Sequence, residues 1–346
     1  MSASARRTTI AVSIDGADIS EDANRYLLQM TYTDHEEDYA DDLQISLDDR
    51  EGVWLENWLD NEDGTKGAEM SAVIIQHNFE SDGNSRILPC GKFEIDSVDS
   101  SGPPAAVEIK ATSLPHTDTL RTETHTRAWE NIKLSAIAGE IASDAGMTLM
   151  YESSYDPLFD RKEQVELSDV VFLQGLCYNA GISLKASGGI IVLFDAAEYE
   201  QKPHVTTIQR GAGNITGWRF GTQANDAKYA RSRVTYTDPA TGQTHNYTFT
   251  PPGASPNGQT LRINERVRSR GEARELARRR LRQKNKGEYQ AEFTLVGDVR
   301  LVAGVTVMLA RWGMFDGKYI IEKATHSVAG GGYSTTVQLR RVLEGY

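Results

Sequence analysis

Apolar and polar residues alternate along three segments in the first third of the chain and along three further segments at its C-terminal end. The segments are residues 67–75, 91–98 and 106–111, and then residues 304–309, 317–324 and 336–341. Alternation between turn signals is typical of strands that bury one face. Because the segments recur in one order, they predict a duplicated β unit with a different module in between. A chance match of short strand patterns is the alternative.

The central segment of each set carries the most specific part of the repeat. Gly-Lys-Phe at residues 91–93 corresponds to Gly-Lys-Tyr at residues 317–319. We therefore expect Gly91 to be equivalent to Gly317, and Phe93 to Tyr319, in two related β-barrels.

Residues 1–115 are predicted to form the first of these barrels. Further strands are expected at residues 8–14, 26–32 and 43–47. The acidic stretch 35–42 is expected to be an exposed connection, and residues 53–59 a short helix or turn that caps a barrel end. A small antiparallel barrel is predicted because so many short strands must hide their edges.

The apolar spacing changes to a helical period in residues 116–197, which predict a small α/β domain. A stripe over residues 132–142 predicts a helix that Gly146 ends. Ser168 can cap a second helix that Gly181 ends. Strands are expected at residues 147–151, 182–185 and 190–194, with residues 153–161 irregular.

Residues 198–346 are predicted to form the second barrel domain, which carries two additions. The glycine-rich residues 198–228 lack the spacing of a nucleotide-binding fingerprint and are expected to cross between domains. The first addition is a long hairpin from residues 230–237 and 244–250, followed by a loop at 251–258.

The second addition is a basic helix that Ser269 can cap and Gly287 can end, before a strand at residues 288–295. The fold class predicted for the whole chain is α+β and mainly β. Two related antiparallel β-barrel domains flank the small α/β domain.

Composition places the chain among globular proteins. It has 346 residues, of which 39% are hydrophobic and 25% charged, so two or three domains are expected. No apolar run approaches the length of a membrane span, and the N-terminus lacks the apolar core of a signal peptide. The two cysteines, Cys90 and Cys177, lie far apart and predict neither a disulfide nor a metal site.

The net charge is −12, but the two signs are separated along the chain. Charges between residues 34 and 63 are nearly all acidic, and those between residues 262 and 286 are mostly basic. The negative total argues against general affinity for nucleic acid, although the basic helix keeps DNA binding as an alternative. We expect this helix to contact an acidic protein surface. The residues predicted to make that contact are Arg274, Arg278, Arg279 and Arg282.

No residues have the spacing of a known catalytic or metal site. The seven histidines are scattered singly, and a metal at His116 and His125 is only an alternative. Cys177 is expected to be a core thiol. The acidic segment, with Asp48 and Asp49, is the one candidate for a carboxylate pair. We predict a non-enzyme without a cofactor, with a cell-wall or polysaccharide-degrading enzyme as the alternative.

Several short motifs follow one another along nearly the whole chain. They are residues 88–96, 101–104, 129–131 with the helix ending at Gly146, 168–173, and 316–319 with His326. This ordered set resembles the late control protein D family of phage tails. The positions that the resemblance marks as structural are Gly91, Phe93, Asp96, Trp129, Ser168, Asp169, Phe172, Leu173, Gly317, Tyr319 and His326.

The resemblance implies a structural baseplate or tail-tip hub, similar to the hub of T-even phages and to the N-terminal part of the type VI secretion spike protein. Such hubs are homotrimers, in which two barrels per subunit give six similar barrels in a ring. The ring adapts a six-fold tail tube to a three-fold spike. Two like barrels per chain, taken three times, give this pseudo-six-fold symmetry in a closed cyclic trimer.

The implied partners are two further copies, a separate trimeric spike protein, a tail tube or tube-initiator protein and other baseplate proteins. No membrane span and no sequence-specific nucleic acid are expected. Because the chain ends at Tyr346 directly after its last strand, the spike and any cell-wall hydrolase are expected to be separate proteins. The protein would be made in the bacterial cytoplasm and assembled into a virion or an injection particle such as a tailocin.

Overall fold

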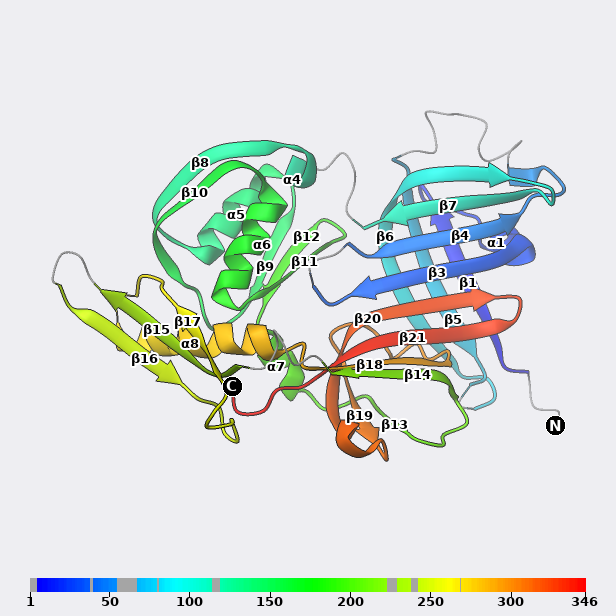
Figure 1. The fold of residues 1–346 in the computed structure, drawn as a ribbon. Helices are drawn as coiled ribbons and strands as arrows, with labels where there is room; N and C mark the ends of the chain where they lie inside the picture. Colours follow the sequence, from blue (N-terminus) through cyan, green and yellow to red (C-terminus); the bar gives the residue numbers. More distant parts are fainter. Residues whose placement is uncertain are drawn as a thin grey trace.

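The computed structural model describes residues 5–37, 40–54, 67–79, 81–113, 119–222, 229–237, 242–267 and 269–346. Most of this part is β-structure. It contains one thirteen-stranded sheet, two three-stranded sheets and one two-stranded sheet (Figure 1). The mainly β, α+β class predicted from the sequence is confirmed.

Six strands of the large sheet form a first β unit. They are β1 (Arg7–Ile14), β3 (Leu27–His35), β4 (Asp42–Asp48), β5 (Glu69–His77), β6 (Ser85–Ser101) and β7 (Ala106–Thr112). Their spatial order is β3-β4-β7-β6-β5-β1. The short β2 (Ala17–Asp18) and α1 (Ser20–Tyr26) lie between β1 and β3. Alternating residues such as Ile10, Ile45 and Ile74 face one core, as the period-two pattern predicts.

Six further strands form a second β unit with the same plan. They are β13 (Thr206–Gln209), β14 (Ile215–Thr222), β18 (Tyr289–Val296), β19 (Thr306–Ala310), β20 (Gly317–Ala329) and β21 (Gly332–Arg341). Their order, β14-β18-β21-β20-β19-β13, matches the first unit strand for strand. One pairing differs, because β13 is parallel to β19 whereas β1 is antiparallel to β5. This order is the one that the predicted duplication requires.

The two closed barrels expected from the sequence are not found among the described strands. Pairing instead follows one open path through both units, from which β19 and β13 branch at β20. The physical reason lies in β20, which is longer than its partner β19. Its first part pairs with β19, and its second part, from Lys323 to Ala329, pairs with β3 of the first unit. The sheet therefore continues from one unit into the other (Figure 1).

The middle of the chain forms a separate module with its own core. Its elements are α4 (Thr119–Thr122), β8 (Thr124–Lys133), α5 (Leu134–Asp144), β9 (Thr148–Glu152), β10 (Leu158–Ser168), α6 (Asp169–Ala180), β11 (Ser183–Ser187), β12 (Ile190–Phe194) and α7 (Ala196–Gln201). In Figure 1 the β8–β10 ribbon curves over α5 and α6. The apolar faces of both helices pack together, through residues such as Ile137 and Leu176.

One strand of this module was not predicted, and one stretch predicted as irregular is partly a strand. Residues 124–133 form β8 before the helix, and the stretch predicted as irregular leads into β10. Both strands are rich in charged and exposed residues, so local alternation is weak. Their pairing over Leu158↔Lys133 to Ser168↔Thr124 stabilises them instead.

A third group of elements is inserted between β14 and β18. It consists of β15 (Tyr229–Thr237), β16 (Thr244–Phe249), β17 (Gln259–Ile263) and α8 (Arg270–Asn285). The predicted hairpin is confirmed as β15–β16, although its turn residues 238–241 lie outside the described part. Ser269 caps α8, since its hydroxyl accepts a hydrogen bond from the Glu272 N–H at 3.1 Å. The apolar face of α8 is buried against the sheet, with Ala273 and Ala277 fully covered.

No helix or strand was predicted in the segment 198–228, which was expected to cross between the domains. It contains the end of α7 and all of β13 and β14. β17 was likewise not predicted. β13 has only four residues, and β14 and β17 contain glycine or charged residues, so only their neighbours in the sheet reveal these strands. Residues 55–59 of the predicted capping turn lie outside the described part, whereas Trp54 is buried at 1% exposure.

Gly146 and Gly181 end α5 and α6 in the same left-handed conformation, with φ of +68° and +66°. Their surroundings differ. A Cβ on Gly181 would lie 2.7 Å from the Cβ of Arg279 in α8, whereas a Cβ on Gly146 would have no atom within 4 Å. At Gly181 the backbone of the middle module therefore packs directly against α8.

We expect Gly181→Ala to lower the free energy of unfolding by about 3 kcal/mol, because it adds a steric overlap to the left-handed strain. Gly146→Ala is the matched control and is expected to cost about 1 kcal/mol, from the strain alone. Urea unfolding of both variants measures the difference. Equal losses would contradict the close approach of α6 and α8.

Candidate interaction sites

The repeated glycine and aromatic positions are equivalent in register. Gly91 lies opposite Ala72 in β5, and Gly317 lies opposite Leu309 in β19. Both glycines have positive φ, +106° and +138°, which disfavours a side chain. The following aromatic residues, Phe93 and Tyr319, are buried in the cores of their respective units.

A bulge follows each aromatic residue at the same distance. The register of β6 on β7 shifts between Ile95 and Ser97, and that of β20 on β21 shifts between Ile321 and Lys323. Asp96 is therefore the equivalent of Glu322. An extra residue bends its strand. The bulge therefore directs the second half of β6 away from β5, and the second half of β20 away from β19.

The motif positions of the middle module lie close together. Trp129 stacks on Phe172 with ring centroids 5.3 Å apart, and its indole N–H donates to Glu140 at 2.5 Å. Leu173 is buried in the same core. Ser168 stands at the N-cap position of α6, but its side chain makes no capping hydrogen bond.

Asp169, the next motif residue, is buried and fully partnered. It accepts hydrogen bonds from Arg127 at 2.7 Å and Gln164 at 2.6 Å, and the His125 ring lies 3.1 Å away. These contacts connect α6 to β8 and β10. His116, the other histidine considered for a metal, lies outside the described residues.

His326 is completely buried at the junction of the two β units. Its Nε2–H donates to the Leu301 carbonyl at 3.0 Å, and its Nδ1 accepts from the Tyr333 hydroxyl at 2.6 Å. The ring also stacks on Tyr32 of the first unit. Burial lowers the pKa of His326 to about 4, so the imidazole is neutral in the folded protein. The role of His326 that these contacts support is structural.

The acidic segment 35–42 was predicted to be an exposed connection, which holds for Asp42 but is wrong for Glu36 and Asp41, since both are buried. Asp34, Glu36 and Asp41 are each less than 9% exposed. Lys185 in β11 lies 2.7 Å from Asp34 and 3.2 Å from Asp41. These acids therefore attach the first β unit to the middle module, because a buried carboxylate needs a cationic partner. Asp38, Glu56, Asp60, Glu62 and Asp63 lie outside the described residues.

Arg340 is the centre of a buried charge cluster that sequence reasoning missed. It pairs with Glu36 at 3.1 Å, with Glu322 at 3.3 Å and with Glu200 of α7. Arg282 of α8 also reaches Glu200, at 2.6 Å. Burial raises the pKa of Glu36 to about 7, although Arg340 opposes this shift. The cluster joins both β units, the middle module and α8.

The four arginines predicted to meet an acidic partner divide into two pairs. Arg279 and Arg282 are buried, and their partners belong to the same chain: Arg279 lies 2.8 Å from Asp195. Arg274 is exposed, and Arg278 is half-buried beside Glu275 at 2.7 Å. Contact with an acidic surface on another molecule stays a prediction. Of the four arginines, only Arg274 and Arg278 are accessible for such a contact.

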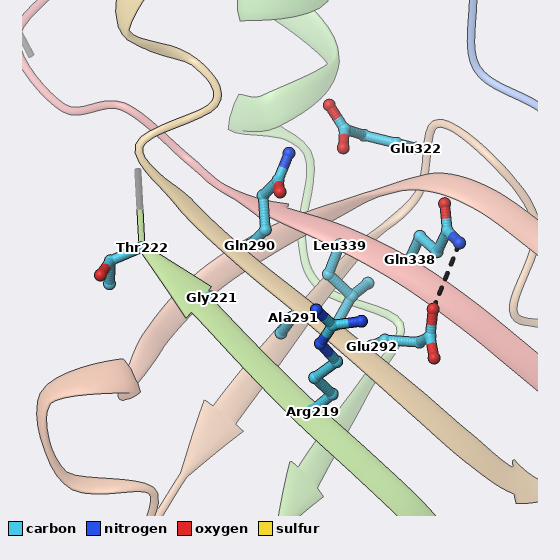
Figure 2. A pocket seen from close by; sticks show the side chains of 9 residues that line it. All are labelled: Arg219, Gly221, Thr222, Gln290, Ala291, Glu292, Glu322, Gln338 and Leu339. Carbon is cyan, nitrogen blue, oxygen red and sulfur yellow. Dashed lines mark hydrogen bonds between the residues drawn. The ribbon is translucent and has the colours of Figure 1, made fainter. Parts of the chain in front are cut away.

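A hollow of about 410 Å³ lies beside β14 (Figure 2). Its lining residues are Arg219, Gly221, Thr222, Gln290, Ala291, Glu292, Glu322, Gln338 and Leu339. Gln338 donates to Glu292 at 3.2 Å, the contact drawn in Figure 2. No ion pair of Arg219 is found within the described residues. The hollow is open and polar, and its side chains do not form a nucleophile with an adjacent base.

The residues considered for catalysis have structural contacts. Asp48 is paired with Arg50 through its carboxylate, and Asp49 is buried and accepts from the Trp54 N–H at 2.8 Å. Cys177 is buried in the middle core. Within the part that the structure describes, no three His, Cys, Asp or Glu residues gather as a metal site requires. None of the helices in the described ranges is long and apolar enough to cross a membrane.

The whole fold occurs in phage tail proteins of known structure. A tail protein from Neisseria meningitidis MC58 superposes with a TM-score of 0.67 at 13% identity, over 97% of this chain and 96% of that chain. The 43 kDa tail protein of prophage MuSo2 from Shewanella oneidensis gives 0.66 at 14% identity, over 96% and 98%. A type VI secretion component of Escherichia coli gives 0.58 at 13% identity, over 97% and 78%. The chain therefore has the fold of phage tail and related secretion-system proteins.

Sequence comparison narrows this class to one family. The chain belongs to the phage tail baseplate hub (GPD) family, whose model matches residues 95–332. It is 28% identical over 191 residues to the probable baseplate hub protein of Escherichia phage P2, and 24% over 186 residues to that of Escherichia phage 186. Each alignment covers 54% of this chain and 44% of the relative, so less than half of the relatives' length is matched. The resemblance found in the motifs is confirmed.

Proposed function

We propose that this chain is a non-catalytic structural hub, which forms a trimeric ring between a tail tube and a spike. The observation that carries the proposal is the strand-for-strand equivalence of the two β units. Three copies of a chain with two like units present six like units, which can meet a six-fold tube on one side and a three-fold spike on the other. Family membership supports the baseplate setting.

The proposed division is residues 1–115 for the first β unit, 116–197 for the middle module and 198–346 for the second β unit with its additions. Each of these regions has a hydrophobic cluster of its own, and the additions form a fourth around β15 and α8. The proposed partners are two further copies, a separate spike protein, a tube or tube-initiator protein and other baseplate proteins. The proposed location is the baseplate of an assembled particle.

Light scattering after gel filtration and negative-stain imaging test the ring. We expect three times the mass of one chain and a ring with three-fold symmetry. A chain that stays monomeric, even when mixed with its tube and spike proteins, would overturn the proposal. A non-catalytic role also predicts that the protein does not degrade purified peptidoglycan. Degradation that is lost on substitution of Asp48 or Asp49 would contradict this role.

A further inference from the structure

The two β units have equivalent edges, but only one of these edges is covered. β3 of the first unit pairs with β20 from His35↔Lys323 to Gln29↔Ala329. β14, the equivalent of β3, pairs only with β18 among the described residues. Residues 97–101 of β6, the equivalent of that part of β20, pair only with β7 in the same described ranges. One complementary pair of edges is therefore open.

Register shifts fix which residues correspond. β3 shifts on β4 between Leu27 and Gln29, and β14 shifts on β18 between Ile215 and Gly217. Counting from these shifts makes Trp218 the equivalent of Met30, and Phe220 the equivalent of Tyr32. The bulges of β6 and β20 likewise make Ser100 the equivalent of His326.

We propose that β14 of one chain pairs in antiparallel fashion with residues 97–101 of β6 in a second copy. The register is the one that β3 and β20 use within the chain, so Gly221 lies opposite Asp99 and Arg219 opposite Ser101. This inference rests on the proposed ring and names the edges that close it. The contact is head to tail, which generates a ring when the rotation between copies closes.

Exposed aromatic surface on β14 supports a protein occupant. Met30 and Tyr32 are 0% and 5% exposed and belong to a core that includes Val328 of β20. At the equivalent positions Trp218 is 56% exposed and Phe220 half-buried. A tryptophan in that position on an unpaired edge strand is a surface that association can bury.

Side-chain sizes on the two proposed partners are complementary. Within the chain, Tyr32 lies opposite His326 and Met30 opposite Val328. In the proposed contact Phe220 lies opposite Ser100, and Trp218 faces Gly102, the next position along. The second copy therefore presents small residues where β14 presents large ones, so the sheets can approach without overlap.

The charges are complementary as well. Asp99 is exposed and lies 3.4 Å from Lys110 of β7, and Arg219 has no ion pair within the described part of its own chain. In the proposed register these two side chains are diagonal neighbours on one face of the sheet. Opposite charges at such positions stabilise a strand pair.

A disulfide test of the full chain decides the register. Asp99→Cys with Gly221→Cys places two thiols directly opposite each other, and mild oxidation is expected to join the chains into covalent trimers on a non-reducing gel. Ser100→Cys with Gly221→Cys is the matched control, because a slip of one residue directs the thiols to opposite faces. The control is expected to stay uncrosslinked.

The outcomes separate this inference from the proposed function. Trimeric mass without cross-linking of the in-register pair would overturn the edge pairing and leave the ring intact. Equal cross-linking of both pairs would overturn the register. A monomeric wild-type chain that yields no cross-link would overturn both proposals.

A charge exchange gives an independent measurement. Asp99→Lys is expected to weaken trimer association by up to about fivefold at each interface, through repulsion from Arg219. Adding Arg219→Glu is expected to restore association. Because Asp99→Lys also loses the pair with Lys110, the restoration is the decisive result. If association is not restored, although circular dichroism shows that both variants are folded, the proposed contact is contradicted.

Discussion

Replacing Arg340 by methionine is expected to lower the free energy of unfolding by about 3–5 kcal/mol. Arg340 is fully buried, and Glu36 and Glu200 beside it are 3% exposed. Methionine fills a similar volume but removes the arginine paired with Glu36 and leaves Glu200 with Arg282 alone. A buried charge without a partner is much more costly than an exposed one.

Thermal or urea unfolding of Arg340→Met measures this loss. Arg50→Met is the matched control, since Arg50 is 70% exposed in its pair with Asp48 and little change is expected. Adding Glu36→Gln to Arg340→Met is expected to recover part of the stability, because it removes one uncompensated charge. A loss no larger than that of Arg50→Met would show that the cluster does not hold the parts together.

His326 is expected to make stability depend on pH. Its pKa is about 4 in the folded chain, compared with an ordinary value of 6.5. The unfolded chain therefore takes up a proton first as the pH falls, and the folded state loses stability between about pH 6.5 and 4. A shift of this size corresponds to about 3 kcal/mol. Above pH 6.5 the contribution is fully present.

Other groups titrate in the same range, including Glu36 with its pKa of about 7, so a comparison between variants is needed. The difference in unfolding free energy between wild type and His326→Gln is expected to shrink as the pH falls from 7 to 4. Val328→Ala removes a buried apolar group at the same junction, and its difference from wild type is expected to be independent of pH. A constant difference for His326→Gln would contradict a neutral buried imidazole.

Several elements could be predicted from local pattern because their physical causes are local. Alternation identified strands such as β5 and β21, which bury one face. Gly146 and Gly181 marked the ends of α5 and α6, since the left-handed conformation favours glycine. β8, β10, β13, β14 and β17 could not be found in this way. β8, β10, β14 and β17 contain charged residues or glycines and β13 has only four residues, so pairing with other strands stabilises them.

The candidate interaction sites show the same division. The paired positions Gly91 and Gly317, with Phe93 and Tyr319, were visible because a duplicated sequence repeats its own spacing. The burial of Asp34 and Glu36 was not visible in the sequence, because a run of acidic residues is expected to be solvated unless its cationic partners are known. Lys185 and Arg340 lie far away in sequence, and Arg340 occupies a strand position with no local sign of its partners.

The sequence by itself determined the mainly β class, the duplication and the family, because alternation, glycine positions and motif order are properties of neighbouring residues. Only the tertiary structure decided how the two β units are joined. After the bulge the second half of β20 stays paired with β21 and on its other side pairs with β3 instead of β19, so the units share one open sheet instead of closing into barrels. Strand edges and buried ion pairs depend on which segments meet in space, and no local pattern of residues specifies that.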